Sequence, residues 1–365
     1  MMSPLTLLAE NRYDTRVDLP PLSAGEEPVA GELDYRGELV RSLATIAGPL
    51  ERVERLLTES LQAKRGEVQP LLDYVAGLGG KRLRPALLLL TAQAIEAARG
   101  RAVNEEAVRL AVVVELVHTA TLVHDDILDA AALRRHRATL HHRWDVPRAI
   151  LVGDWLFTQA YSLANAGEST VPGRWVAAAA KAVCEGEIQQ DVAAEGGGGS
   201  SESQYLRMLA GKTGALCAVS CSLGAWAAGA DTARCEEMYD FGMKLGVAFQ
   251  IHDDWLDIYG DPAKTGKPLG GDLAGGKWTL PVLRFMEAAE PSDRTEMLRI
   301  IGSGEAPANI DAVRELLDRY AASQYARQFA VRLIHQANDS LEALSHGAER
   351  TAIQRLAAAA VQRCC

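Results

Sequence analysis

An acidic phrase, D-D-x-x-D, occurs twice in this chain, at 125–129 and at 253–257. Each copy interrupts an otherwise apolar stretch, as Val-His-Asp-Asp-Ile-Leu-Asp and as Ile-His-Asp-Asp-Trp-Leu-Asp. On an α-helix the first and last aspartates of a copy share one face, because residues i and i+4 are neighbours there. The fold must therefore solvate these carboxylates or pair them with cations, since burying them uncompensated is costly.

A single copy would be typical of a solvated acidic helix face. Two near-identical copies with matching apolar flanks instead favour a cluster of hard divalent cations with oxygen ligands. Mg²⁺ is the ion we expect, because it also binds substrate phosphates. His124 and His252 precede the copies, but Mg²⁺ prefers oxygen, so we expect these imidazoles to pack or orient neighbours. The candidate metal ligands are Asp125, Asp126, Asp129, Asp253, Asp254 and Asp257.

Helical patterns dominate the chain from Glu38 onward, and strand-like alternation is scarce. Residues 1–36 hold several prolines and acids without periodicity and are predicted to be a poorly ordered extension. The rest, 37–365, is predicted to be one all-α domain. The expected helices cover 38–62, 66–76, 82–98, 105–129, 147–165, 173–194, 202–229, 232–259, 277–289, 309–321, 323–345 and 349–363.

The composition excludes some classes of partner. The formal net charge of −10 argues against nonspecific nucleic-acid binding, although it permits a locally basic pocket for an anionic substrate. The six cysteines are scattered without zinc-site spacing, which indicates a reducing, cytoplasmic compartment. No secretory signal is visible, and we expect no membrane span.

Basic clusters accompany both acidic phrases. Gly-Gly-Lys-Arg-Leu-Arg-Pro stands at 79–85, Arg134 and Arg135 follow the first phrase, and lysines recur at 212, 264, 267 and 277. Guanidinium groups bind phosphate oxygens through paired donors, and lysine supplies a point charge. None of these segments contains the full G-x-x-x-x-G-K-[ST] loop, so a nucleotide triphosphatase is excluded. Two basic sets and two acidic sets suggest two phosphorylated substrates in one apolar cavity.

These motifs, in their order and spacing, resemble the trans-isoprenyl diphosphate synthases, the polyprenyl synthetase family, over about residues 38–365. The matching stretches are GGKRLRP at 79–85, ELVHTATLVHDDILD at 115–129, LRR at 133–135, VGDWLF at 152–157, EGEIQQ at 185–190, GKTGAL at 211–216, FQIHDDWLDIYGD at 249–261 and TGKPLGGDLAGGKWTLP at 265–281. The resemblance implies a single-domain helical bundle of the isoprenoid-synthase type around a central apolar cavity. It also implies a homodimer.

The resemblance assigns roles to individual residues. The diphosphate of isopentenyl diphosphate would be held by Lys81, Arg84, His118 and Arg135. The allylic diphosphate would be held by Arg134, Lys212 and Lys267, assisted by Thr213, Gln250 and Lys277. Asp125 and Asp129 would bind two Mg²⁺ ions and Asp253 a third, with the other three aspartates completing or orienting that set. Catalysis would depend on Asp125, Asp129, Lys212 and Asp253.

The implied reaction is ionisation of the allylic diphosphate, attack by the double bond of isopentenyl diphosphate, and loss of a proton. Chain length should depend on what blocks the growing tail upstream of Asp125. Ala120 is small, and Thr121, Val117 and Val113 add no aromatic floor, so we expect a long product, about C30 to C50, with transient membrane contact on release. If Ala120 is merely a packing residue, the product would be about C15 to C20.

The sequence departs from the family pattern at two positions: His136 replaces a common glycine, and Gly275 replaces a common acid. Three other functions stay open at this stage. A class I terpene cyclase shares the fold and an acidic motif but needs no second diphosphate site. A non-catalytic partner subunit would usually lose the acidic motifs. Mg²⁺-dependent binding of a bisphosphonate diphosphate mimic would argue against a helical metal-binding scaffold.

Overall fold

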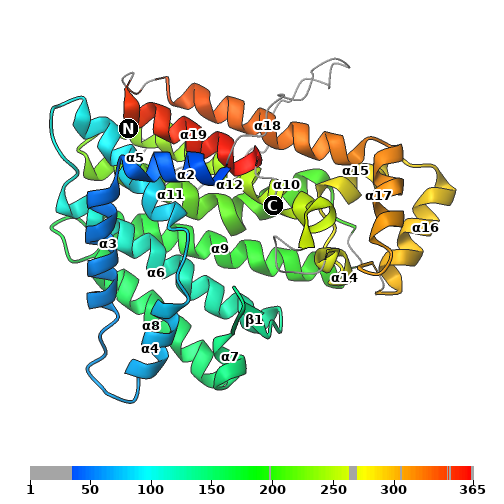
Figure 1. The fold of residues 1–365 in the computed structure, drawn as a ribbon, viewed down its shortest axis with the longest axis horizontal. Helices are drawn as coiled ribbons and strands as arrows, with labels where there is room; N and C mark the ends of the chain where they lie inside the picture. Colours follow the sequence, from blue (N-terminus) through cyan, green and yellow to red (C-terminus); the bar gives the residue numbers. More distant parts are fainter. Residues whose placement is uncertain are drawn as a thin grey trace.

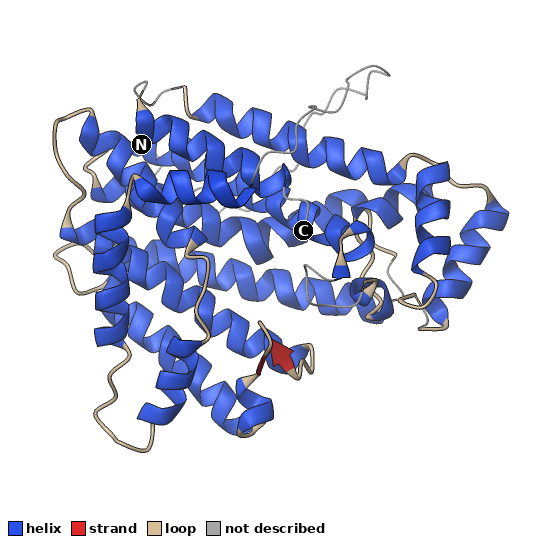
Figure 2. Cartoon of the chain, viewed as in Figure 1, coloured by secondary structure: helices blue, strands red, loops and turns tan. Residues whose placement is uncertain are grey.

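The computed structural model describes residues 35–196, 199–262, 269–304, 306–342, 344 and 347–362. Most of this part of the chain is helical, as Figures 1 and 2 show, and the all-α prediction is confirmed. Most of the predicted extension, 1–34, lies outside the described residues, whereas Tyr35 and Arg36 are already helical. The helices are α2 (Tyr35–Ala44), α3 (Ala47–Ser60), α4 (Gln69–Gly77), α5 (Leu83–Ala97), α6 (Glu105–Leu128), α7 (Leu140–Arg143), α8 (Val146–Ala164), α9 (Val171–Glu195), α10 (Glu202–Leu209), η1 (Ala210–Gly214), α11 (Ala215–Ala227), α12 (Thr232–Tyr259), α14 (Gly271–Ala274), α15 (Leu280–Ala288), α16 (Pro291–Gly302), α17 (Ile310–Arg319), α18 (Ala322–Ser340) and α19 (Ala348–Gln362).

Helices α6 and α12 carry the two acidic phrases. Helix α6 packs against α5, α8 and α11, while α12 packs against α11 and α18. Such central helices are apolar on most sides, as buried helices must be. The unpaired backbone N–H groups at their first turns need hydrogen-bond acceptors. The Asn104 side chain accepts from the Ala107 N–H at the start of α6, and Asp231 accepts from Arg234 at the start of α12. The local sequence thus begins each helix where the bundle requires it.

Two helical stretches are long and apolar enough to cross a membrane by length and composition alone. They are Glu105–Leu128 and Glu202–Ala227, and 67% and 89% of their most apolar windows are buried inside the protein. Burial within the bundle explains their composition, because core helices of globular proteins are apolar all round.

A smaller second core forms at one end of the bundle, around helices α14 to α17 (Figure 1). It contains Phe285, Met297 and Leu317, all of them buried. This core supports the end of α12 from which the second acidic phrase projects, since Ile258 of that helix belongs to it.

Prolines explain two differences between the predicted and observed helices. The stretch 38–62 forms two helices, because Pro49 lacks an N–H and cannot continue a helix from the preceding turn. Helix α16 was not predicted, and it begins at Pro291, a residue well suited to the first helical turn.

A short hairpin was also not predicted. Strands β1 (Leu133–Arg134) and β2 (Arg137–Ala138) pair antiparallel, and Figure 2 shows this hairpin among the helices. Its two turn residues, Arg135 and His136, have φ values of 51° and 61°. Left-handed backbone of this kind favours glycine, which explains why a glycine is common in the family where this chain has His136.

Candidate active site

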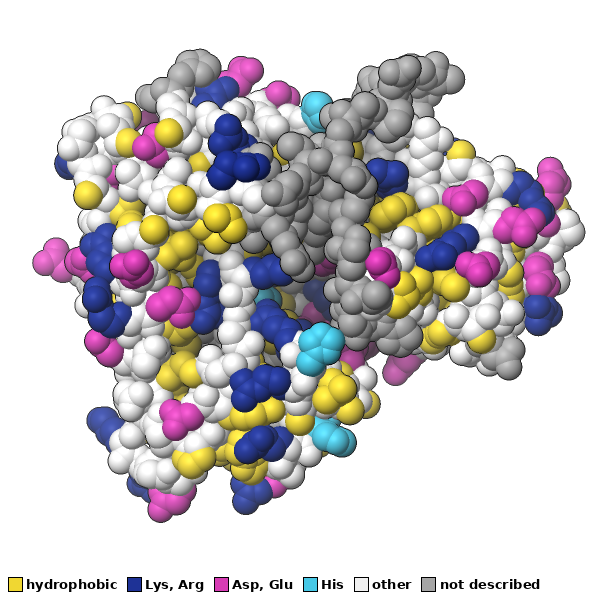
Figure 3. Space-filling view, in the orientation of Figure 1, with side chains coloured by type: hydrophobic (Ala, Val, Ile, Leu, Met, Phe, Trp, Pro, Cys, Tyr) yellow, Lys and Arg dark blue, Asp and Glu magenta, His cyan; other side chains and the backbone are white. Residues whose placement is uncertain are grey.

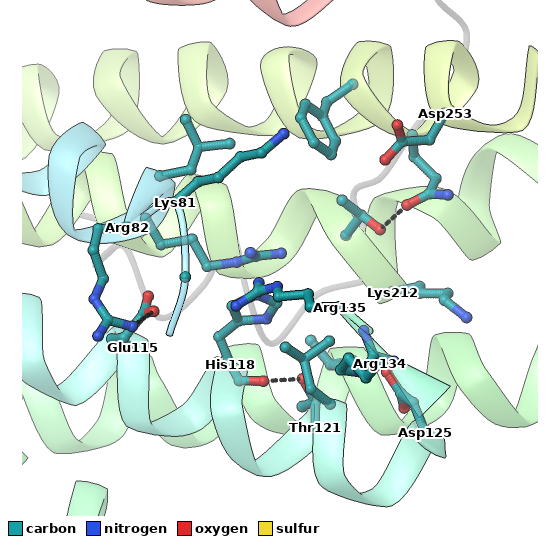
Figure 4. Close-up of a pocket in the computed structure, with 18 of the residues that line it drawn as sticks. Lys81, Arg82, Glu115, His118, Thr121, Asp125, Arg134, Arg135, Lys212 and Asp253 are labelled. Carbon is teal, nitrogen blue, oxygen red and sulfur yellow. Dashed lines mark hydrogen bonds and ion pairs between the residues drawn. The ribbon is translucent and has the colours of Figure 1, made fainter. Parts of the chain in front are cut away.

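One cavity of about 350 Å³ brings the predicted site residues together. Asp125 of α6 and Asp253 of α12 line it, with the loop before α5 and η1 contributing the basic side chains. Figure 4 shows the two aspartates on opposite walls with Lys212 between them, and Lys81, His118 and Arg135 further along. Segments far apart in the sequence therefore converge, as the two-phosphate hypothesis requires.

The five positions of each acidic phrase differ in exposure, and only the first aspartate of each phrase lines the cavity. Asp253 and Asp257 are half-buried, and Asp129 is exposed, whereas Asp126 and Asp254 are only 4% and 7% exposed. The middle aspartate of each phrase turns away from the cavity toward a protein partner. Arg134 Nε donates to Asp126 at 2.6 Å, and Tyr205 and Gln250 donate to Asp254.

Buried carboxylates lie close to one another in and beside this end of the cavity, and their pKa values are raised. Burial, followed by the neighbouring Glu187 carboxylate, raises the pKa of Asp125 to about 7. Burial and the charges of Asp254 and Asp257 raise the pKa of Asp272 to about 7 as well. The charge of bound cations would relieve this repulsion.

The residues predicted to hold isopentenyl diphosphate form the opposite end of the cavity. Lys81, Arg84, His118 and Arg135 all line it. Burial, together with the charges of Arg84 and Arg135, lowers the pKa of His118 well below its ordinary value, so the imidazole is neutral. Among the described residues, the buried Nε of Arg84 has no acceptor. Such an orphaned donor suits an anionic ligand.

Arg82 points away from this anion site although it stands between Lys81 and Arg84. It caps α5 with a left-handed φ of 51°, and its guanidinium contacts Glu54 at 2.5 Å and Glu115 at 2.7 Å. The two carboxylates hold Arg82 at the far end of the cavity (Figure 4). Arg135 also donates to the carbonyl of Gly79, which ties the hairpin to the glycine loop.

Three of the four cations predicted for the allylic diphosphate are paired with a carboxylate. Arg134 contacts Asp126, Lys212 Nζ lies 2.8 Å from Glu187 Oε2, and Lys277 Nζ lies 3.0 Å from Asp129 Oδ1. Each carboxylate offsets part of the cost of desolvating the cation beside it. Lys267 lies outside the described residues.

Thr213 and Gln250 bond to each other across the helices that carry them. The Thr213 hydroxyl donates to Gln250 Oε1 at 2.9 Å, and both residues line the cavity. Their assistance to the allylic diphosphate stays a prediction.

Glycines press η1 against α9 so that Lys212 projects into the site. A Cβ on Gly186 would lie 2.4 Å from the backbone nitrogen of Lys212, and one on Gly211 would lie 2.8 Å from the carbonyl oxygen of Ala182. One-turn π-helices are often found at functional sites because they re-aim side chains within a continuous helical segment. The glycines of Gly-Lys-Thr-Gly at 211–214 therefore allow close helix packing, while its lysine supplies the positive charge.

Several site residues were not predicted from the sequence. Glu187 lines the cavity and pairs with Lys212, Glu115 pairs with Arg82, and Asp272 approaches Asp257 through its backbone N–H at 3.0 Å. Glu187 stands in EGEIQQ, a stretch that matches the family but carries no spacing signal of its own. Only the packing of α9 against η1 places it in the site.

Of the residues predicted to set chain length, Thr121 lines the cavity. Ala120 and Val117 have no exposure, because they pack into the core beside it. The two histidines next to the acidic phrases pack rather than face the cavity. His124 lies against Gly153 and Phe157 of α8, while His252 stacks on Trp255.

The acidic residues suit a Mg²⁺ ion that is held jointly by the protein and by substrate phosphates. No three acidic, histidine or cysteine side chains converge into a preformed metal cluster within the part of the chain that the structure describes. Mg²⁺ is ordinarily held by one or two carboxylates, water and substrate phosphates rather than by a protein cage. Asp125 and Asp253 on facing walls, beside basic groups, suit an ion that arrives with a diphosphate.

Basic side chains also mark the surface above the cavity. Lys and Arg residues gather over the middle of the face shown in Figure 3, although the chain as a whole is acidic. The field at the cavity mouth would attract an anionic substrate.

Comparisons with known proteins agree with this geometry. The family model described as polyprenyl synthetase matches residues 66–320. A short chain isoprenyl diphosphate synthase from Methanothermobacter thermautotrophicus is 35% identical over 295 residues, which cover 80% of this chain and 89% of the relative.

Solved structures of long-chain and unspecified relatives are equally similar. A decaprenyl diphosphate synthase from Rhodobacter capsulatus superposes with a TM-score of 0.82 at 30% identity, covering 89% of this chain and 99% of the other. A polyprenyl synthase from Caulobacter crescentus, complexed with calcium and isoprenyl diphosphate, gives a TM-score of 0.82 at 32% identity, covering 90% and 98%.

Proposed function

The chain belongs to the polyprenyl synthetase family and is a prenyl diphosphate synthase, and we propose that it extends an allylic diphosphate with isopentenyl diphosphate to a long trans-polyprenyl diphosphate. One observation carries this proposal. The first aspartate of each acidic phrase, Asp125 and Asp253, lines the same cavity as the basic loop before α5. Such a cavity suits two diphosphates held with their apolar parts in contact.

The two ends of the cavity suit different substrates. The end with Lys81, Arg84, His118 and Arg135 lies away from the aspartates and would hold isopentenyl diphosphate without metal. The neutral His118 imidazole can donate a hydrogen bond to phosphate, and the guanidinium groups can bind it through paired donors. Arg134, Lys212 and Lys277 lie beside the aspartates and would hold the allylic diphosphate.

We propose that Asp125, Asp129 and Asp253 would hold three Mg²⁺ ions, with Asp126, Asp254 and Asp257 orienting them. Bound Mg²⁺ supplies Lewis-acid weakening of the allylic carbon–oxygen bond. Support comes from the raised pKa of Asp125, because a bound cation would stabilise the charged form of this buried carboxylate.

The chain itself would position the reactants and exclude water. Lys212 and Arg134 would bind the departing diphosphate oxygens, while Leu122, Val183 and Phe249 supply apolar wall beside the reacting carbons. No side chain needs to form a covalent bond with substrate. The released diphosphate is a suitable proton acceptor, so we assign no general base.

For product length we propose about C30 to C50, because Ala120 and the two turns before it carry no aromatic side chain. The tail would extend along α6 by displacing small core side chains near Ala120 and Val117. The similarity to a short-chain synthase favours a second candidate, about C15 to C20, since that relative matches this chain as well as the long-chain structures do.

The remaining partners are also proposals. We propose a cytoplasmic homodimer, supported by exposed apolar side chains on α8 and α9, namely Leu151, Ile188 and Val192. Leu133 is 62% exposed next to Arg134 of the cavity, which suits transient membrane contact when an apolar product leaves.

The test is incubation of purified protein with isopentenyl diphosphate, farnesyl diphosphate and Mg²⁺, followed by mass spectrometry of the dephosphorylated products. We expect linear prenyl alcohols of about C30 to C50 and no turnover after chelation. Products that stop at C20 would select the short-chain candidate. Cyclic hydrocarbon made without isopentenyl diphosphate would show a terpene cyclase, and no product with any primer would refute the proposal.

A further inference from the structure

We propose that Tyr205 is a positioning residue that holds the second acidic phrase in its metal-binding orientation by fixing Asp254. This inference rests on the proposed function of the same site. Tyr205 lies on α10 and does not line the 350 Å³ cavity. It acts through Asp254, so its role is to position rather than to touch substrate.

A chain of hydrogen bonds, of which the first is buried, connects Tyr205 to the site. The Tyr205 hydroxyl donates to Asp254 Oδ2 at 2.6 Å, and Gln250 Nε2 donates to Asp254 Oδ1 at 2.8 Å. The Thr213 hydroxyl donates to the other end of the Gln250 amide at 2.9 Å. Tyr205 is 2% exposed, so no solvent competes for its hydroxyl.

The geometry ties two helical segments together at two points. Tyr205 and Thr213 belong to the continuous segment α10–η1, while Gln250 and Asp254 are one turn apart on α12. Each tie lies next to a cavity residue, because Lys212 precedes Thr213 and Asp253 precedes Asp254. The network thus sets the relative positions of Lys212, which would bind the allylic diphosphate directly, and Asp253, which would bind it through Mg²⁺.

Both oxygens of Asp254 accept a hydrogen bond from a neutral group. A buried carboxylate needs such donors, because leaving it unsatisfied is costly. Without the Tyr205 hydroxyl, the Asp254 carboxylate would turn toward a cation, and the charge of Lys212 already acts on it. That rotation would draw Lys212 away from the diphosphate and move the second acidic phrase out of its metal-binding orientation.

The experiment compares wild type with Tyr205→Phe, which removes one oxygen and keeps the ring. The matched control is Tyr325→Phe, whose hydroxyl also bonds to α10, at Glu202, but far from Asp254 in the bonding network. Magnesium dependence, the KM of each substrate and calorimetric binding of Mg²⁺ with inorganic diphosphate are measured for all three proteins. Circular dichroism checks that each is folded.

We expect Tyr205→Phe to raise the half-saturating Mg²⁺ concentration and the allylic KM about tenfold, as loss of one charge-assisted hydrogen bond implies. The calorimetric Kd for diphosphate with Mg²⁺ should rise by a similar factor. The KM of isopentenyl diphosphate should stay within twofold, and Tyr325→Phe should match wild type.

Two results would overturn the inference while leaving the proposed function intact. One is a Tyr205→Phe variant with wild-type magnesium dependence and diphosphate affinity. The other is an equal rise in the KM of both substrates, which would indicate a merely structural role. A wild-type protein that makes no prenyl product, yet loses diphosphate affinity in Tyr205→Phe, would refute the proposed function alone.

Discussion

Lys277 Nζ lies 3.0 Å from Asp129 Oδ1 although the two residues are 148 positions apart. Asp129 caps the C-terminal end of α6, while Lys277 precedes α15, so this ion pair connects the first acidic phrase to the segment between α14 and α15. Lys277, which is predicted to bind the allylic diphosphate, thus pairs with Asp129, which is predicted to bind metal. Metal binding at Asp129 would free Lys277, which makes metal and diphosphate binding mutually favourable.

Lys277→Gln should therefore weaken the allylic site selectively. We expect the allylic KM to rise about tenfold while the KM of isopentenyl diphosphate changes less than twofold, because only one end of the cavity loses a cation. Steady-state kinetics with each substrate varied in turn provides the measurement. Lys244→Gln, which breaks a surface pair with Asp240, is the control and should match wild type. Equal effects of the two variants would contradict the assignment.

The raised pKa of Asp125 predicts a pH-dependent stability in the absence of metal. Its folded-state pKa of about 7 exceeds the unfolded value of about 3.9, so the folded state binds the proton more strongly. The contribution to stability is complete below about pH 4 and is lost as pH rises through about 7. Thermal unfolding with chelator should show this loss, and Asp125→Asn should flatten it. Addition of Mg²⁺ with diphosphate should restore stability at pH 8, and an Asp125→Asn profile identical to wild type would argue against the raised pKa.

Asp125→Asn should also abolish most of the activity. The variant removes a predicted metal carboxylate without changing side-chain size, so we expect kcat to fall at least about a thousandfold. Turnover is measured with both substrates saturating. A variant that keeps more than a tenth of wild-type kcat would show that the first phrase does not hold the catalytic metal.

Gly186→Ala should disturb the site through packing. The new Cβ would lie 2.4 Å from the backbone nitrogen of Lys212, so η1 must move, at a cost of about 1–3 kcal/mol. We expect a lower melting temperature together with a loss of activity. Gly48→Ala is the control, since nothing lies within 4 Å of its added Cβ, and it should not destabilise the protein. An active, equally stable Gly186→Ala variant would refute the proposed packing of η1.

Ala120→Phe should shorten the product. Ala120 is fully buried and immediately precedes Thr121 of the cavity wall, and a phenyl ring there would block a tail that follows α6. Mass spectrometry of the products should show a loss of several isoprene units. If the variant is folded and its product length is unchanged, the tail does not pass this position.

Much of the fold could be predicted from the sequence, because helix formation depends on local patterns. The long helices that carry the acidic phrases were predicted within a residue or two, and so was the shared face of Asp253 and Asp257. Helix boundaries were wrong where a single residue interrupts a long helical pattern. Pro49, near the start of α3, separates that helix from α2. The hairpin at 133–138 was missed because its turn uses Arg135 and His136 in a conformation that usually signals itself through glycine.

The site, like the fold, could be predicted from the sequence only in part. By itself the sequence determined which side chains could carry charge into an apolar cavity, since the acidic and basic motifs are local in the chain. Only the tertiary structure decided their partners: Glu187 for Lys212, Glu115 for Arg82, and Tyr205 for Asp254. Each of these pairs joins different helices, and their contact depends on how those helices pack and in what register. Helix periodicity is a short-range property, whereas packing register is settled by the whole core at once.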